Sequence, residues 1–189
     1  MKTGFRHHIG GYQAVCGVTP DLTAFGKAIG NGYSVAGIAG TTAIMDLLGS
    51  ASETNATIEG TYNAAPYAMA AGITTLGILR DNGIERLYDL GDRLRAGLQQ
   101  AVDTAGIQAC VTGYGSEWAI YFCDRAPRNY REVLATNTEL AESWRRGMYE
   151  AGILEPPFAL TDRRLCPATS EDDIDQTIEA AGQVLANIR

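Results

Sequence analysis

The spacing of apolar residues changes twice along the chain. Before Gly60 they occur in short runs among glycines and β-branched residues, a pattern typical of short strands joined by turns. From Pro66 they recur at intervals of three and four, as in helices with one apolar face. After Ile107 short apolar runs and helical stretches alternate. The pattern predicts an α/β chain with part of a mainly parallel sheet before Gly60, then two helices, then a small α+β domain.

The segments before Gly60 are predicted to be short. Residues 21–29 and 35–41 have the composition of strands or strand ends, and Gly30-Asn31-Gly32 between them is a turn signal. Residues 43–48 allow one or two helical turns, whereas the small polar residues 51–59 predict a loop.

Two longer helices are predicted next. The first begins near Pro66, which is tolerated in a first turn, and Asp81-Asn82-Gly83 ends it after Arg80. The second covers residues 84–104. The apolar face expected for the first helix consists of Tyr67, Ala70, Ala71, Thr74 and Leu79, and that of the second of Leu87, Leu90, Leu94, Leu98 and Val102.

The C-terminal part is predicted to mix strands and helices. Residues 130–151 indicate a helix broken near Thr136, and Ser170 begins a last helix whose acidic first turn suits the helix dipole. We place a domain boundary at the end of the second helix, which gives domains at residues 1–106 and 107–189. Short strands are expected at residues 108–112, 117–122, 153–155 and 164–166.

Composition excludes several function classes. The net charge of −7 and the isoelectric point near 4.8 argue against nucleic-acid or anionic-membrane partners, because both require a basic face. No apolar stretch approaches the length of a membrane span. The start of the chain carries charge but no apolar run, so we expect no signal peptide and a cytoplasmic location.

The remaining polar and aromatic residues suggest no metal site. The adjacent His7 and His8 are expected in a surface loop, and we expect no zinc site. The four cysteines lack a C-x-x-C spacing and read as reduced core residues: Cys16, Cys110, Cys123 and Cys166. Three aromatic residues of the C-terminal domain are expected to pack rather than to form a substrate cage: Tyr114, Trp118 and Tyr121.

Lys27 is the first candidate for chemistry. A lysine between Gly26 and Ala28 is most often a surface residue. Here its apolar neighbours in sequence, including Phe25 and Ile29, suggest a partly desolvated amine. Desolvation favours the neutral amine, which is the form that reacts with an aldehyde cofactor.

Thr61 is the second candidate. By itself it is a loop threonine ahead of a helix. Alternatively, its hydroxyl and the free N–H groups at the start of the Pro66 helix would bind an anion such as a phosphate.

Three segments in order carry a family resemblance. The stretch from Thr3 to Gly37, with TGFR, Gly10-Gly11, VTPDL, Gly26-Lys27 and a glycine-rich turn, resembles the cofactor-lysine segment of class III aminotransferases. Residues 59–71, EGTYNAAPYAMAA, resemble that family's G-T-x-x-x-N-P-x-A-x-A-A segment, and residues 164–167 resemble its R-x-x-P segment. Within the family, the sequence of residues 10–22 most resembles that of the glutamate-1-semialdehyde aminomutase branch.

The resemblance implies a fold, a cofactor and site residues. The fold would be the type I fold of enzymes dependent on pyridoxal 5'-phosphate (PLP). Residues 1–106 would be the C-terminal part of the large domain with its connecting helices, and residues 107–189 the small domain. Lys27 matches the lysine that forms the Schiff base with PLP and moves the proton between substrate and cofactor. Thr61 matches the threonine that binds the cofactor phosphate, usually that of the neighbouring subunit in a homodimer.

Arg164 matches an arginine that can pair with a substrate carboxylate through a bidentate fork. The alternative, an ordinary arginine beside Asp162, is equally supported by the sequence.

Two departures from the family pattern bear on activity. Ala65-Pro66 replaces Asn-Pro, which removes a polar capping group near the phosphate. In the family an Asp-Glu-Val precedes TGFR, and its Asp pairs with the pyridine nitrogen of PLP, whereas here Met1 stands about where that Val would be. That Asp, the aromatic that stacks on the ring and a glycine-rich phosphate loop are all expected upstream.

Two functions are therefore expected from the sequence. The first is a PLP-dependent aminotransferase or aminomutase, acting on an amine or amino acid and a carbonyl acceptor, of which this chain is a C-terminal part that is inactive alone. The alternative is a truncated, non-catalytic protein that folds partly or only associates with other subunits.

Overall fold

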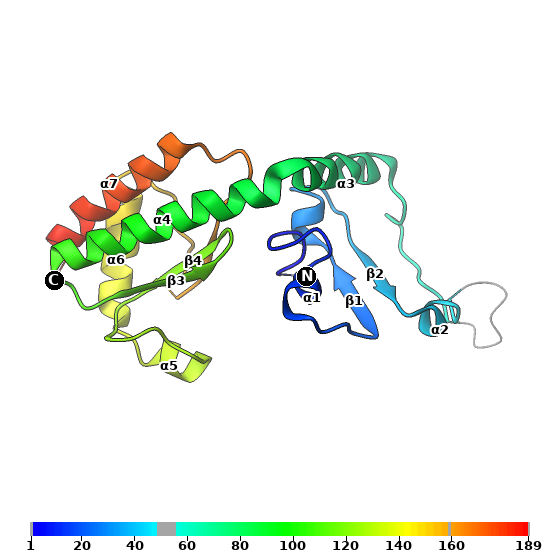
Figure 1. Cartoon of the computed structure of the whole chain (residues 1–189), viewed down its shortest axis with the longest axis horizontal. Helices are drawn as coiled ribbons and strands as arrows, with labels where there is room; N and C mark the ends of the chain where they lie inside the picture. The colour runs from blue at the N-terminus through cyan, green and yellow to red at the C-terminus, as the bar shows by residue number, and fades with distance from the viewer. Residues whose placement is uncertain (1, 49–55, 159, 189) are drawn as a thin grey trace. The chain divides into compact units, whose positions relative to one another are not determined.

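Two separate hydrophobic cores divide the chain into two compact units, Met1–Ile84 and Glu85–Arg189. Figure 1 shows the computed structural model, which describes residues 2–48, 56–158 and 160–188. The first core is small, with Ile29, Val35 and Ala68 buried at its centre. The second is much larger and takes side chains from three helices and a sheet.

The observed division differs from the expected boundary at residue 106. Helix α4 (Ile84–Ala105) buries its apolar face in the C-terminal core, so it belongs almost entirely to the second unit. The five residues predicted for that face are all buried, which confirms the prediction: Leu87, Leu90, Leu94, Leu98 and Val102.

The N-terminal unit contains one pair of strands among its described residues. Strand β1 (Leu22–Phe25) pairs with β2 (Gly37–Gly40) in antiparallel fashion, so the expected parallel arrangement is wrong for these strands. A Cβ on Gly37 would lie 2.5 Å from the Phe25 ring, which explains a glycine opposite Phe25. Two short helices flank the pair, α1 (Tyr12–Cys16), which we did not predict, and α2 (Thr42–Met45).

The loop expected at residues 51–59 lies partly outside the described residues. Within the described part, an isolated parallel bridge joins Ala56 to Leu48, and residues 57–59 form neither helix nor strand.

Helix α3 (Pro66–Ile78) begins at the predicted proline, but its buried face differs from the expected one. Ala68 and Gly72 are buried, whereas Tyr67 and Ala70 are exposed. The predicted interruption at Asp81-Asn82-Gly83 is confirmed, because the helical turn η2 (Leu79–Gly83) is broken by a kink at Asn82, where φ is 173° and ψ is 1°.

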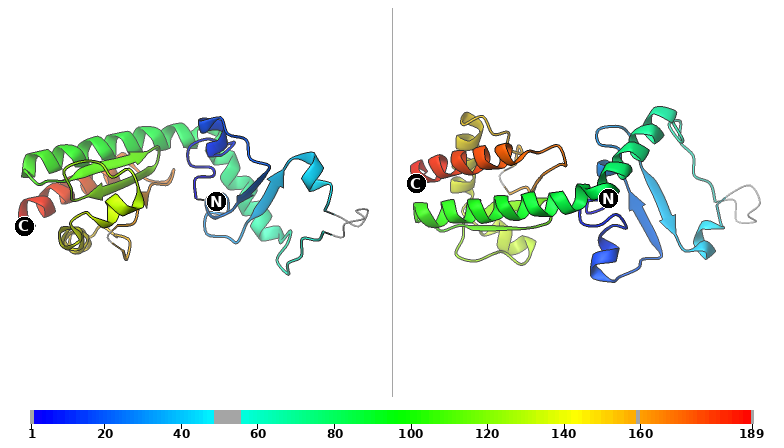
Figure 2. Two further views of the ribbon diagram at one scale, coloured as in Figure 1. Left: turned by 90° about the horizontal axis from the view of Figure 1, so that it is seen from below. Right: turned by 45° about the horizontal axis from the view of Figure 1, so that its top comes forward.

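The C-terminal unit packs helices on a three-stranded antiparallel sheet ordered β3-β4-β5. The strands are β3 (Cys110–Tyr114), β4 (Glu117–Tyr121) and β5 (Arg163–Arg164). Trp118 and Ile120 of β4 lie in one core with α4, α6 (Thr138–Glu150) and α7 (Glu171–Asn187). Figure 2 shows α4 running along β3 and β4.

One prediction around α6 is confirmed and another is wrong. The helix expected at residues 130–151 is two helices, α5 (Tyr130–Leu134) and α6, and the break at Thr136 is confirmed. Residues 153–155 form no strand, because the Ile153 N–H bonds the Met148 carbonyl at the end of α6 and the Glu155 side chain pairs with Arg163.

Large apolar side chains remain exposed mainly in the N-terminal unit. They include side chains from both strands, from α1 and from α3, among them Tyr12, Leu22, Ile38, Met69 and Ile73. Exposed apolar patches of this kind promote association. A unit with so few buried apolar residues also has little free energy to offset its conformational entropy.

We therefore expect the whole chain to bind a hydrophobic dye and to aggregate. Because the second unit has its own core, a polypeptide of residues 85–189 should be monomeric, bind little dye and melt cooperatively. Dye fluorescence and sedimentation of the two polypeptides check this, and a monodisperse whole chain with a sharp melt and no dye signal would contradict it.

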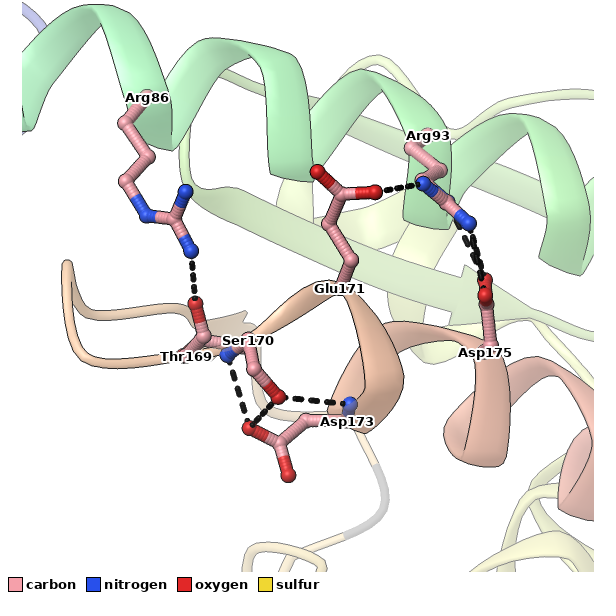
Figure 3. A network of polar contacts seen from close by, with 7 residues as sticks. All are labelled: Arg86, Arg93, Thr169, Ser170, Glu171, Asp173 and Asp175. Carbon is pink, nitrogen blue, oxygen red and sulfur yellow. Dashed lines mark hydrogen bonds and ion pairs between the residues drawn. The ribbon is translucent and has the colours of Figure 1, made fainter.

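Polar contacts fix the start of α7 on α4 (Figure 3). Ser170 caps the helix in a capping box, since its hydroxyl accepts the Asp173 N–H at 3.1 Å and Asp173 accepts the Ser170 N–H at 2.8 Å. Arg93 binds Asp175 through both carboxylate oxygens and Glu171 at 2.6 Å, and Arg86 donates to the Thr169 carbonyl at 3.0 Å.

Replacing Ser170 with alanine should lower the free energy of unfolding by about 1 kcal/mol, the usual effect of losing an N-cap. The backbone N–H of Ser170, and then its hydroxyl, hold the pKa of Asp173 below its ordinary value of 3.8. A lowered folded pKa adds stability above the unfolded pKa and loses it as the pH falls through the folded pKa. The effect of Ser170→Ala should therefore shrink in acid, whereas Ser170→Thr should retain the cap, as measured by urea unfolding at neutral pH and below pH 3.8.

Candidate functional site

Lys27 lies on the turn that directly follows strand β1. It begins a short 3-10 helix, η1 (Lys27–Ile29), and its backbone has a φ of 54°. Residues other than glycine rarely adopt this left-handed backbone conformation, which costs of order 1–3 kcal/mol and is concentrated at functional sites. Two residues later, Ile29 is buried against Val35 and Ala68, so the turn is anchored on helix α3.

The environment of Lys27 differs from the expected one. Its apolar neighbours in sequence suggested a desolvated amine, but the Lys27 side chain is exposed. Ile29, two residues later, is buried instead. In this chain, therefore, the described residues leave the amine accessible to water and to a reactant.

The glycine-rich turn after Lys27 is required by close backbone contacts. A Cβ on Gly30 would lie 2.1 Å from the Tyr33 carbonyl oxygen, and the Tyr33 N–H bonds the Gly30 carbonyl at 3.0 Å. Asn31 and Gly32 both have positive φ, 44° and 102°. The turn signal at residues 30–32 is confirmed, and the turn leads the chain back toward β2.

Thr61 lies in an exposed turn just before helix α3. The Asn63 N–H bonds the Gly60 carbonyl at 3.0 Å, and the Ala65 N–H bonds the Tyr62 carbonyl at 3.2 Å. The helix that follows begins with Pro66, and no side-chain hydrogen bond from Ala65 caps it. The absence of a polar capping side chain at Ala65-Pro66, expected from the sequence, is therefore seen in the structure. The backbone N–H groups in the first turn of α3 remain suited to binding an anion.

The fold brings Lys27 and the start of α3 into one unit. Ala68, which contacts the core residue Ile29, lies in the first turn of α3, and Thr61 precedes that turn. Lys27 and Thr61 therefore belong to one compact unit, in which η1 packs against α3.

Arg164 is already engaged by two carboxylates. Its Nε donates to Glu117 Oε1 at 2.9 Å, and its Nη2 pairs with Asp162. A substrate carboxylate would have to compete with both partners, so the geometry favours the alternative of a structural arginine beside Asp162. It lies in the C-terminal unit, apart from the unit that carries Lys27.

The cysteines and His7 differ from expectation. Cys16 and Cys166 are exposed, and Cys110 and Cys123 are half-buried, so none of the four is a fully buried core residue. His7 is buried rather than on the surface, with its ring edge-on to Tyr12 at 5.4 Å. Trp118 is buried as expected.

Other kinds of site find little support in the described part of the chain. No three His, Cys, Asp or Glu side chains gather there as a metal site, and no helix there is both long and apolar enough to cross a membrane. An open pocket of about 630 Å³ lies beside α1, β1 and β2, but neither Lys27 nor Thr61 lines it.

One signal for Lys27 was present in the sequence and was not used. The chain has 15 basic residues, but only two of them, Lys2 and Lys27, are lysines. Because arginine occupies almost every other cationic position, a lysine at an exposed, strained turn indicates a need for a primary amine, which only lysine supplies.

Comparisons with known proteins identify the family. The model of the class-III aminotransferase family matches residues 3–181. Glutamate-1-semialdehyde 2,1-aminomutases from Neisseria meningitidis serogroup A and Thermus thermophilus are 36% and 35% identical, and the alignments cover 97% and 98% of this chain. Each alignment covers 43% of the relative, so the chain spans less than half the length of these curated relatives.

Solved structures agree on the fold. An ω-transaminase from Sphaerobacter thermophilus is 32% identical with a TM-score of 0.87, over 96% of this chain and 42% of the other. A transaminase with PLP bound is 26% identical with a TM-score of 0.80, over 98% of this chain and 43% of the other. A glutamate-1-semialdehyde aminomutase from Pseudomonas aeruginosa, 21% identical with a TM-score of 0.81 over all of this chain and 43% of the other, supports the fold alone.

The resemblance, the type I fold and PLP as the family cofactor are thereby confirmed. The chain belongs to the class-III aminotransferase family of PLP-dependent enzymes.

Proposed function

We propose that this chain supplies the cofactor lysine of a PLP-dependent aminotransferase or aminomutase, which moves an amino group between an amine or amino acid and a carbonyl acceptor. The observation that carries the proposal is Lys27 itself. It is an exposed primary amine on a left-handed turn after β1, in a chain whose family uses a lysine at the matching position.

The residues present fit two ends of the cofactor. Lys27 offers the amine that bonds an aldehyde carbon, while Thr61 and the uncapped start of α3 offer a hydroxyl and N–H donors for a phosphate. When bound, PLP supplies the electron sink that stabilises negative charge on the substrate carbon. We assign no described residue to the ring nitrogen.

Lys27 would do the protein's part of the proton chemistry. With the cofactor bound, the Lys27 Nζ would accept a proton from the substrate carbon and return it at another position. Because Ile29 packs against α3 and Gly30 forms a tight turn with Tyr33, the backbone of Lys27 is held while its side chain is exposed. That combination suits a group that must reach two atoms in succession.

The remaining roles rest on the resemblance. Thr61 would contact the phosphate of a neighbouring subunit in a homodimer, and Arg164 would contact a substrate carboxylate only if Glu117 or Asp162 released it. The cytoplasmic location also remains a prediction.

The test adds PLP and a second polypeptide, which corresponds to the part of the relatives that this chain does not match. Amino-group transfer is then measured. Activity should appear with the native chain and fall below detection with Lys27→Ala. Lys2→Ala is the matched control, because it removes the other lysine, and it should leave activity unchanged. Transfer that survives Lys27→Ala would contradict the assignment of the lysine.

The same experiment addresses the second candidate, a non-catalytic protein that only associates with other subunits. The exposed apolar side chains of the N-terminal unit favour association. A complex that forms but stays inactive for the native chain would support that candidate.

A further inference from the structure

Cys110 and Cys123 lie close together at one end of the sheet of the C-terminal unit. Cys110 begins β3 and stands opposite Tyr121 of β4, and Cys123 is two residues beyond Tyr121. The Cys123 N–H bonds the Tyr121 carbonyl at 3.1 Å, so the chain turns sharply as it leaves β4. The turn keeps Cys123 beside the first residue of β3.

The two cysteines are in contact, because the Cys110 Sγ donates to the Cys123 carbonyl at 3.4 Å. The Cys123 Sγ donates to the Arg125 carbonyl at 3.1 Å. The other two cysteines have different surroundings, with Cys16 bonded to the Gln13 carbonyl and Cys166 near the Thr169 hydroxyl.

We propose that Cys110 and Cys123 form a redox-modification site, at which a small-molecule disulfide such as oxidised glutathione converts the two thiols into an intramolecular disulfide. The contact geometry carries the proposal, since a disulfide needs neighbouring cysteines and the Cys110 Sγ already lies 3.4 Å from the Cys123 carbonyl oxygen.

The reaction proceeds by two thiol–disulfide exchanges. The Cys123 thiolate attacks one sulfur of the small disulfide, its S–S bond breaks, and one small thiol leaves. Cys110 then loses its proton to water and attacks the Cys123 sulfur of the mixed disulfide, which releases the second small thiol. Two protein thiols are oxidised while one small disulfide is reduced to two thiols.

The order of attack follows from the environment. Burial and then the neighbouring Cys123 raise the pKa of the Cys110 thiol to about 11, so it stays protonated at neutral pH. A protonated thiol is a poor first nucleophile. As the second nucleophile, Cys110 acts within one molecule, where proximity offsets its small thiolate fraction.

The link would restrain one corner of the C-terminal unit. It would close the chain between Cys110 and Cys123 and fix the segment in which the Phe122 carbonyl accepts the Asn137 N–H at 3.0 Å, at the start of α6. The urea midpoint of the oxidised protein should therefore shift upward relative to the reduced protein.

The test uses the whole chain with Cys16→Ser and Cys166→Ser, which removes the exposed thiols. After treatment with oxidised glutathione under native conditions, we expect both remaining thiols to be lost, the mass to fall by two hydrogen atoms, and one cross-linked peptide to contain both cysteines. Dithiothreitol should restore both thiols.

Adding Cys110→Ser to that background is the matched control. It should trap a glutathione adduct on Cys123, which shows that Cys123 can make the first attack without Cys110. A stable glutathione adduct with both cysteines present, or oxidation only after unfolding, would overturn the proposal.

Discussion

This chain alone should not retain pyridoxal phosphate after dialysis, and it should not transfer amino groups. Among its described residues, the expected cofactor contacts are Lys27, Thr61 and the start of α3. By the family resemblance, the ring-nitrogen carboxylate, the stacking aromatic and the phosphate loop belong to the part of the relatives that this chain does not match. The chain covers 43% of the relatives' length, so most of the cofactor site would have to be supplied by other residues.

The expected loss of affinity is large. A charge-assisted hydrogen bond contributes roughly 1.5–3 kcal/mol, and two such bonds to the ring nitrogen and the phosphate would be missing. At about 1.4 kcal/mol per tenfold change, affinity should be roughly 10²- to 10⁴-fold weaker than in a complete site. A Schiff base on an exposed lysine is also open to hydrolysis by water.

The measurement is visible absorbance of the dialysed chain after incubation with PLP. The native chain, Lys27→Ala and Lys2→Ala should all return to the protein baseline. Adding the remaining part of the relatives' length should produce absorbance that is lost only in Lys27→Ala. Stable, Lys27-dependent absorbance from the chain alone would show that the site is more complete than proposed.

Local patterns in the sequence predicted the C-terminal helices well. The leucines of α4 repeat at helical spacing because one face packs on a sheet, and a one-sided pattern can be read without knowing the partner. The capping box at Ser170 is equally local, because both partners lie within one turn.

Features set by contacts distant in sequence were not predictable in this way. The direction of the β1–β2 pair depends on how the chain crosses between strands, and α3 is apolar on several sides, so its buried face is chosen by Ile29 and Val35. Helix α4 also packs into the second core, and the turn signal at Gly106 gave no information about these contacts.

The candidate site divides in the same manner. Lys27 and Thr61 could be identified from motif order, but the apolar neighbours of Lys27 in sequence did not predict that its side chain is exposed. Asp162 could be predicted as a partner of Arg164 because it is close in sequence. Glu117 is 47 residues away and becomes a partner only because β4 pairs with β5.

A buried ion pair in the C-terminal unit should control its stability. The side chains of Arg163 and Glu155 are 6% and 2% exposed. Arg163 Nε donates to Glu155 Oε2 at 2.8 Å, and its Nη1 donates to the Thr161 carbonyl at 2.8 Å. The guanidinium also lies 5.2 Å from the centre of the Trp118 ring. One side chain therefore holds both ends of the loop between Glu155 and Thr161.

Replacing Arg163 with methionine should lower the free energy of unfolding by roughly 3–5 kcal/mol, because it leaves the Glu155 carboxylate buried without a counter-charge. The double variant Arg163→Met, Glu155→Leu should recover much of that loss, since replacing a buried pair by apolar residues is often close to neutral. A matched surface control in the same unit is Arg125→Met, because Arg125 and its partner Glu132 are 62% and 32% exposed. Its effect should stay below about 1 kcal/mol.

Tryptophan fluorescence in urea measures these changes in the relevant unit, because Trp118 and Trp144, the two tryptophans of the chain, both belong to its core. We expect Arg163→Met to unfold at a much lower urea concentration, the double variant to unfold between it and the native chain, and Arg125→Met to overlay the native curve. If Arg163→Met unfolded with the native midpoint, the pair would contribute nothing to stability. If the double variant were as unstable as the single one, the loss would come from packing on Trp118 and from the Thr161 contact, not from an uncompensated carboxylate.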